Sequence, residues 1–114
     1  HLHAIGGDPP PATLALEARL RRAIYRRLGT QTLGMDAIAR ELGISSRTLR
    51  RRLLEGRTIY QQILDGVRRE LANELLGDPS HKLSEVASLL SFSQASAFHR
   101  AYVRWTGKTP RQRG

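Results

Sequence analysis

The chain contains no cysteine, which excludes disulfides, thiolate zinc sites and cysteine nucleophiles within its 114 residues. It has no apolar run close to the ~20 residues that a membrane-spanning helix needs, and no signal-peptide pattern. A glycine-rich phosphate loop is missing, and two of the four histidines lie in the first three residues, so no metal site is suggested. We therefore expect a cytoplasmic protein with no membrane partner, no metal and no cofactor.

Lysine and acidic residues are scarce, and arginine supplies nearly all of the positive charge. Lysine and arginine together number 19 against 10 acidic residues, which gives a net charge of +9, and only Lys82 and Lys108 are lysines. An excess of this size on a small folded chain favours polyanions, with nucleic acid ahead of an anionic membrane surface. Arginine suits bidentate contact with phosphate or guanine, although a GC-rich genome gives the same bias.

The spacing of apolar residues predicts an all-α fold of about seven helices. In every periodic segment these residues recur about every 3.6 positions, and no segment alternates as a strand does. The length fits one domain, or two very small ones that share a core. We expect two helix-turn-helix subdomains joined by a long connecting helix.

The order of these elements divides the chain into four parts. Residues 1–12, rich in glycine and proline, predict a flexible linker or tail. Residues 13–57 would hold an N-terminal helix and the first helix-turn-helix, and residues 58–77 the connecting helix. Residues 78–114 would hold the second helix-turn-helix and a C-terminal helix that starts at Thr109-Pro110.

Two long helices would supply most of the apolar surface. The first, capped by Thr13 and ending near Leu28, places four residues on one face: Leu16, Leu20, Ile24 and Leu28. The connecting helix, residues 59–76 after a Thr58 cap, does the same with Ile63, Val67, Leu71 and Leu75. Gly66 costs that helix ~1 kcal/mol relative to alanine, which predicts a close packing contact at that point.

One pattern occurs twice, in residues 36–53 and 84–102. Each copy predicts a short amphipathic helix, a tight turn and a second helix that begins after a serine, Ser45 or Ser93. In the first copy Leu49, Leu53 and Leu54 point inward, and the outward side chains are Arg47, Arg50 and Arg51. In the second copy Phe98 and Tyr102 point inward, and the outward residues are Gln94, Ala95, Ser96, His99 and Arg100.

The second helix of such a unit fits the DNA major groove while the first braces it. Arginine is the commonest side chain that reads guanine O6 and N7, and four arginines within residues 47–52 repel one another unless a polyanion compensates. A solvated charged face is the alternative for this helix. For residues 94–100 the alternative is an ordinary polar surface over a packed core, and for Phe92 and Trp105 core filling is favoured over base stacking.

Both copies resemble the AraC/XylS family of bacterial transcription regulators, over about residues 14–113. The second copy carries the family's C-terminal signature in Val86-Ala87, Leu90, Phe92-Ser93, Ser96, Phe98, Arg100, Tyr102, Arg104, Gly107 and Thr109-Pro110. The first copy matches in Ile38-Ala39, Leu42-Gly43, Ser45, Thr48-Leu49 and Arg51. A match this long and ordered is far more specific than a lone helix-turn-helix.

The resemblance implies a bilobed DNA-binding domain that binds double-stranded promoter DNA as a monomer. It also implies fusion behind an effector-sensing or dimerisation domain, and activation of transcription through contact with RNA polymerase. Carried over by position, Arg47, Arg50 and Arg51 would read bases in one half-site. Ala95, Ser96, His99 and Arg100 would read the other.

Two positions depart from the family pattern. Ser91 stands where the family prefers glycine, which predicts a turn strained by ~1 kcal/mol or shaped differently. Ala95 has no hydrogen-bonding group, so it can only make an apolar contact, for example with a thymine methyl. We therefore expect less sequence information from the second unit.

Other functions fit these residues less well. A non-specific architectural DNA-binding protein is the main alternative, and the outward arginines argue against it. Some DNA-repair alkyl-acceptor proteins carry a similar module, but their chemistry needs cysteine. Glu85 and His99 form no acid–base group with Ser93 or Ser96, so no enzymatic activity is expected. The charge balance gives no reason to favour a protein-interaction adaptor.

Overall fold

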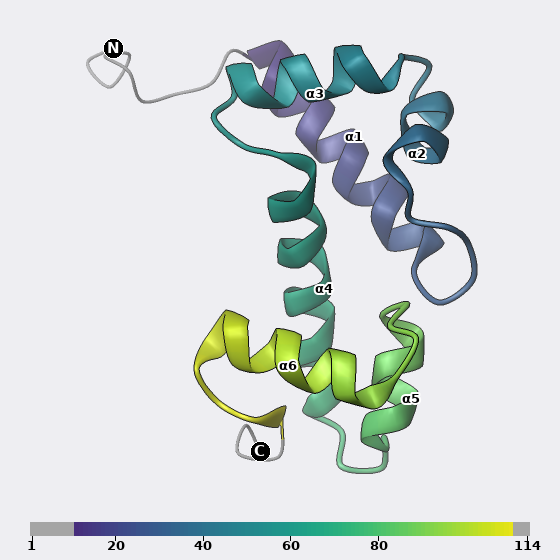
Figure 1. The fold of residues 1–114 in the computed structure, drawn as a ribbon, viewed down its shortest axis with the longest axis vertical. Helices are drawn as coiled ribbons and strands as arrows, with labels where there is room; N and C mark the ends of the chain where they lie inside the picture. Colours follow the sequence, from purple (N-terminus) through teal and green to yellow (C-terminus); the bar gives the residue numbers. More distant parts are fainter. Residues whose placement is uncertain (1–10, 111–114) are drawn as a thin grey trace.

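The computed structural model describes residues 11–110, which form six helices and no strand. In order these are α1 (Pro11–Arg27), α2 (Met35–Glu41), α3 (Ser46–Glu55), α4 (Tyr60–Leu76), α5 (Leu83–Leu89) and α6 (Ala95–Thr106) (Figure 1). The all-α prediction is confirmed, with six helices rather than about seven in this range. The C-terminal helix expected from Thr109-Pro110 would lie mainly in residues 111–114, outside the described residues, as does most of the expected tail.

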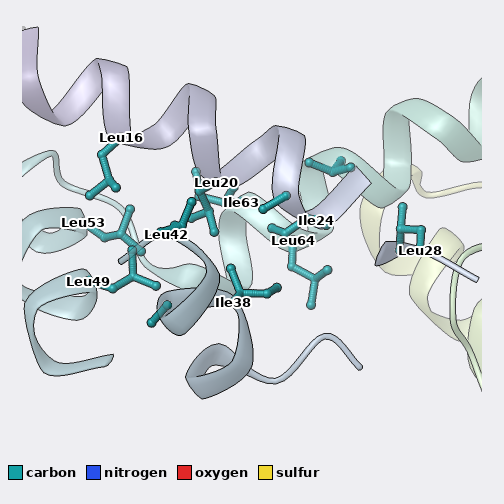
Figure 2. Close-up of a cluster of buried hydrophobic side chains, with 13 residues drawn as sticks. Leu16, Leu20, Ile24, Leu28, Ile38, Leu42, Leu49, Leu53, Ile63 and Leu64 are labelled. Atoms are coloured by element: carbon teal, nitrogen blue, oxygen red, sulfur yellow. The ribbon is translucent and has the colours of Figure 1, made fainter. Parts of the chain in front are cut away.

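The first hydrophobic core lies among α1, α2, α3 and the start of α4 (Figure 2). The predicted apolar face of α1 is buried in it, and α2 contributes Ile38 while α3 contributes Leu49 and Leu53. From α4 the residues Ile63, Leu64 and Val67 complete it. These side chains hold the first helix-turn-helix against α1.

The second core is smaller and relies on aromatic rings. Its buried residues are Ala72, Val86, Ala87, Leu90, Phe98 and Tyr102. Phe98 lies between Phe92 and Tyr102, with ring centroids 5.7 and 5.9 Å away, and half-buried Trp105 packs on the same cluster. The inward positions of Phe98 and Tyr102 and the core role of Phe92 and Trp105 are confirmed.

Helix α4 belongs to both cores and is the connecting helix that the sequence predicts. Half-buried Leu71 packs against both clusters. Near the end of α4, Asn73 accepts a hydrogen bond from the Tyr102 hydroxyl of α6 at 3.0 Å. A Cβ built at Gly66 would lie 3.5 Å from the Arg21 guanidinium, an ordinary contact, so Gly66 does not mark an unusually close approach.

Several predicted helix starts are wrong by one to three residues. Helix α1 begins at Pro11, because proline suits a first helical turn where an N–H has no partner, and Thr13 is a buried helical residue rather than a cap. The N-cap of α4 is Ile59, not Thr58, and that of α6 is Gln94, not Ser93. Ser45 caps α3 as predicted, accepting from the Thr48 N–H at 3.1 Å.

Leu54 does not face the core, contrary to prediction. It follows Leu53 by one residue, which turns its side chain about 100° around the helix, and it is 57% exposed while Leu53 is fully buried. The apolar stripe of α3 is therefore narrow, and the rest of its circumference is open to solvent.

This difference predicts unequal effects of truncating two neighbouring leucines. Leu53→Ala should lower the free energy of unfolding by about 2–5 kcal/mol, because it leaves a cavity in the first core. Leu54→Ala should change it by about 0.5 kcal/mol or less. Denaturant unfolding of both variants measures this. Equal losses would mean that Leu54 also packs in the core in solution.

Candidate nucleic-acid interface

The turn of the first helix-turn-helix is built on glycine. Gly43 has φ +78°, a left-handed conformation that glycine adopts without strain. The Ile44 N–H then donates to the Ala39 carbonyl at 3.1 Å, and Ser45 caps α3 directly afterwards. From α1, Arg19 donates to the Leu42 carbonyl at 3.0 Å. The turn is thus fixed from within and from the helix beneath it.

The second turn repeats this geometry with serine in place of glycine. Ser91 has φ +66°, and the Phe92 N–H donates to the Ala87 carbonyl at 2.9 Å. Arg68 of α4 donates to the Leu90 carbonyl at 2.9 Å and to the Ser91 carbonyl at 3.1 Å. The left-handed turn expected to carry strain is therefore present, and it keeps the shape of the first turn.

Arg68 is half-buried beneath the second turn. It stacks 4.1 Å above the centroid of the Phe92 ring, a cation–π arrangement. Burial lowers the pKa of Arg68, while the charge of nearby Asp65 opposes that shift. An arginine remains protonated under such conditions, so both turn carbonyls accept from a charged donor.

Helix α3 presents the three predicted arginines on its open side. Arg47, Arg50 and Arg51 are all exposed, and with Leu54 and Glu55 they line a shallow depression. Arg50 lies 3.9 Å from the Met35 sulfur. Arg51 forms an ion pair with Glu55 at 3.3 Å, and its side chain is still 61% exposed.

Helix α6 presents the second predicted set, and all five of its members are exposed: Gln94, Ala95, Ser96, His99 and Arg100. Gln94 is the N-cap residue of α6, and its side chain accepts a hydrogen bond from the Ser96 hydroxyl at 3.2 Å. The structure therefore groups the predicted residues into two separate sets, one on each helix.

The two sets lie far apart on one elongated molecule. The principal extents are 44 × 34 × 19 Å, and α3 and α6 lie toward opposite ends of the longest axis (Figure 1). In that view α3 passes in front of α1 and α6 passes in front of α4, so both lie toward the same face. In this view both helices run across the direction of α4.

Three residues of this surface were missed by sequence reasoning. Arg19 and Arg68 hold the turns, and Glu55 pairs with Arg51. A signal for the first two exists, because each arginine precedes its turn leucine by a similar separation, 23 and 22 positions. Glu55 follows Arg51 by four residues, the usual spacing of a helical ion pair.

Two further features bear on residues 11–110, namely metal-ligand clusters and membrane-spanning helices. No cluster of three or more histidine, aspartate or glutamate side chains is placed to hold a metal ion there. In the same range no helix combines the length and the apolar character that crossing a membrane requires.

Comparison with known proteins places this geometry in a family. A family model described as a helix-turn-helix domain matches residues 38–113. A second model, a DprA winged helix domain, matches residues 8–55, but residues 11–110 contain no strand that would form a wing.

Two curated relatives are regulators of transcription or metabolism by name. An ornithine utilization regulator of Pseudomonas aeruginosa is 44% identical over 95 residues, which span 83% of this chain and 28% of that protein. The transcriptional activator AggR of Escherichia coli is 37% identical over 75 residues, 66% of this chain and 28% of its own length. The chain thus corresponds to less than a third of either relative.

A solved structure has a similar fold over most of the chain. It is a transcriptional regulator from Chromobacterium violaceum, described among AraC-type DNA-binding domain-containing proteins, with a TM-score of 0.79. The likeness covers 91% of this chain and 93% of that one at 21% identity, so it bears on the fold. Since the helix-turn-helix model covers two thirds of the sequence, the chain belongs to the AraC/XylS family of transcription regulators, as a DNA-binding domain of that type.

Proposed function

We propose that one copy of this chain binds double-stranded DNA sequence-specifically, with α3 and α6 in two successive segments of the major groove. The observation that carries the proposal is the placement of α3 and α6 toward one face and opposite ends of a 44 Å axis. Successive major-groove segments on one side of DNA are ~34 Å apart. The 17 residues of α4 span about 26 Å, which suits a spacer between them.

The exposed side chains suggest different roles for the two helices. Arg47, Arg50 and Arg51 are suited to guanine O6 and N7 in one half-site. On α6, Gln94, Ser96, His99 and Arg100 offer fewer bidentate groups, and Ala95 offers only a methyl contact. The α6 half-site would then depend more on backbone contacts and DNA deformability.

The role of the longer protein is inferred from its relatives. We infer that the full-length protein is a cytoplasmic regulator that binds promoter DNA and contacts RNA polymerase. An effector-sensing domain would lie outside this chain, since the chain spans 28% of the length of the regulators it resembles. The relative AggR is a transcriptional activator, which favours activation of transcription.

Selection of binding sites from random double-stranded DNA tests the proposal directly. We expect one information-rich, guanine-containing half-site and one weaker half-site about a turn away, because good bidentate contacts discriminate by about 1–3 kcal/mol per base pair. Sequences without any enriched motif would favour a non-specific architectural protein instead. Two halves of equal information would show that α6 reads bases as fully as α3.

Single substitutions on α3 separate base reading from general attraction. Arg50→Ala should cost about 1–3 kcal/mol of binding free energy on the selected site and relax the preference at one base position. Arg52→Ala is the matched control, because Arg52 is exposed on the same helix and, two residues after Arg50, lies on another side of it at about 100° per residue. Arg52→Ala should weaken binding to all DNA sequences about equally, or leave binding unchanged. A uniform loss for Arg50→Ala would contradict direct readout by that residue.

The ion pair between Arg51 and Glu55 predicts that an acidic residue restrains binding. To reach a base, Arg51 must leave Glu55, and an exposed ion pair of this kind is worth about 0–1 kcal/mol. Glu55→Gln should therefore tighten binding by up to about fivefold. In an Arg51→Ala background the gain should vanish, which a double-mutant cycle of dissociation constants measures. An undiminished gain would assign the effect to repulsion between Glu55 and phosphates.

A further inference from the structure

The turn between α5 and α6 contacts the first helix-turn-helix unit as well as α4. The backbone N–H of Gly29, just after α1, donates to the Ser91 Oγ at 2.7 Å across 62 positions of sequence. Gly29 also lies close to the backbone at the end of α5. A Cβ built on Gly29 would lie 3.3 Å from the Leu89 carbonyl oxygen. The end of α1 therefore touches the second unit at its turn.

This contact matters because the two hydrophobic cores are separate. Apart from α4, whose Leu71 packs against both, each core draws its buried residues from its own unit. The orientation of the second unit relative to the first is therefore set by packing on one shared helix and by any direct contact between the units. Arg68 attaches the turn to α4, and Ser91 attaches the same turn to α1. These hydrogen bonds come from two different parts of the chain. Together they restrict the orientation of the second unit more than either would alone.

Ser91 adopts a conformation that serves this contact and is otherwise unfavourable. Its φ of +66° lies in the left-handed region, where a residue with a Cβ is strained and glycine is not. The equivalent residue of the first turn is Gly43, which has φ +78° and no atom within 4 Å of a built Cβ. The serine thus costs backbone strain and gains a hydrogen bond that glycine could not make.

We propose that Ser91 is a positioning residue, whose hydrogen bond to Gly29 sets the angle between α3 and α6 and so the half-site spacing that the chain accepts. The consequence for spacing rests on the proposed function, because it requires both helices to bind one DNA. The effect on the angle between the two units does not depend on DNA binding.

The angle is tested without DNA. Because the chain has no cysteine, spin labels at Arg40→Cys and Arg104→Cys, exposed on α2 and α6, report the distance between the units by pulsed electron resonance. Ser91→Gly relieves the strain and removes the acceptor, so it should broaden the distance distribution without lowering the melting temperature. Ser91→Ala removes only the acceptor and should broaden it as well. An unchanged width in both variants would overturn the proposal.

Gly43→Ser is the matched control for placing serine in a left-handed turn. Gly43→Ser adds strain in the first unit. Apart from its chain neighbours, no atom lies within 4 Å of a Cβ built on Gly43 to act as a hydrogen-bond partner. The distance distribution should keep its width in this variant. Equal broadening would assign the effect to turn strain in general and overturn the role of the Ser91–Gly29 bond.

Spacing is tested with the unlabelled chain on its selected site and on sites lengthened or shortened by one base pair between the halves. The parent should prefer the original spacing, and Ser91→Gly should reduce that preference by about fivefold, the factor of one net hydrogen bond. An unreduced preference would overturn the proposal. If the parent shows no spacing preference at all, the proposed two-site function fails, and the distance distribution still decides whether Ser91 fixes the angle.

Discussion

The orientation of both outward-facing helices depends on an arginine that binds the turn before each of them. Arg19 of α1 donates to the Leu42 carbonyl, and Arg68 of α4 donates to the Leu90 carbonyl, at 3.0 and 2.9 Å. Each acceptor follows the end of a short helix, where carbonyls have no partner within the helix, and a charged donor makes the stronger bond there. Because the turn sets the angle between its two helices, this bond and the buried faces of α3 and α6 together orient the outward side chains.

The two units therefore share a frame and differ in what they expose. Each has a long helix, a short helix, a left-handed turn and a final helix, in the order α1–α2–α3 and α4–α5–α6. Within that frame α3 carries a run of arginines, whereas α6 exposes Ala95, Ser96 and His99 beside Arg100 and Arg104. A serine at the second turn costs conformational energy, and its hydroxyl reaches Gly29 in the other unit. The difference between the units thus extends from surface chemistry to how they are joined.

Much of this could be predicted because it depends on local periodicity. The buried face of α1, the inward Phe98 and Tyr102, the Gly43 turn and the Ser45 cap all follow from spacing and residue type. The caps expected at Thr58 and Ser93 are wrong because neighbouring residues also fit a first turn, and tertiary packing decides among them. Arg68 and the Ser91–Gly29 bond were beyond local reasoning, since their partners lie 22 to 62 positions away.

Ion pairs with acidic residues are unevenly distributed over the surface. The net charge of +9 is therefore concentrated in some parts of the surface rather than spread evenly over it. Glu41 binds Arg26 and Arg27, and hydrogen bonds from Arg27 and then Arg26 hold the pKa of its carboxyl below the usual value. Glu70 forms an ion pair with Arg21. These acids pair with three of the five arginines of α1.

Within residues 11–110 neither Arg47 nor Arg50 of α3 forms an ion pair with an acid. Like charges so close together oppose helix formation, and α3 tolerates them because Ser45 caps it and Leu49 and Leu53 are fully buried. The first core thus stabilises a surface whose own electrostatics are unfavourable until a polyanion binds it.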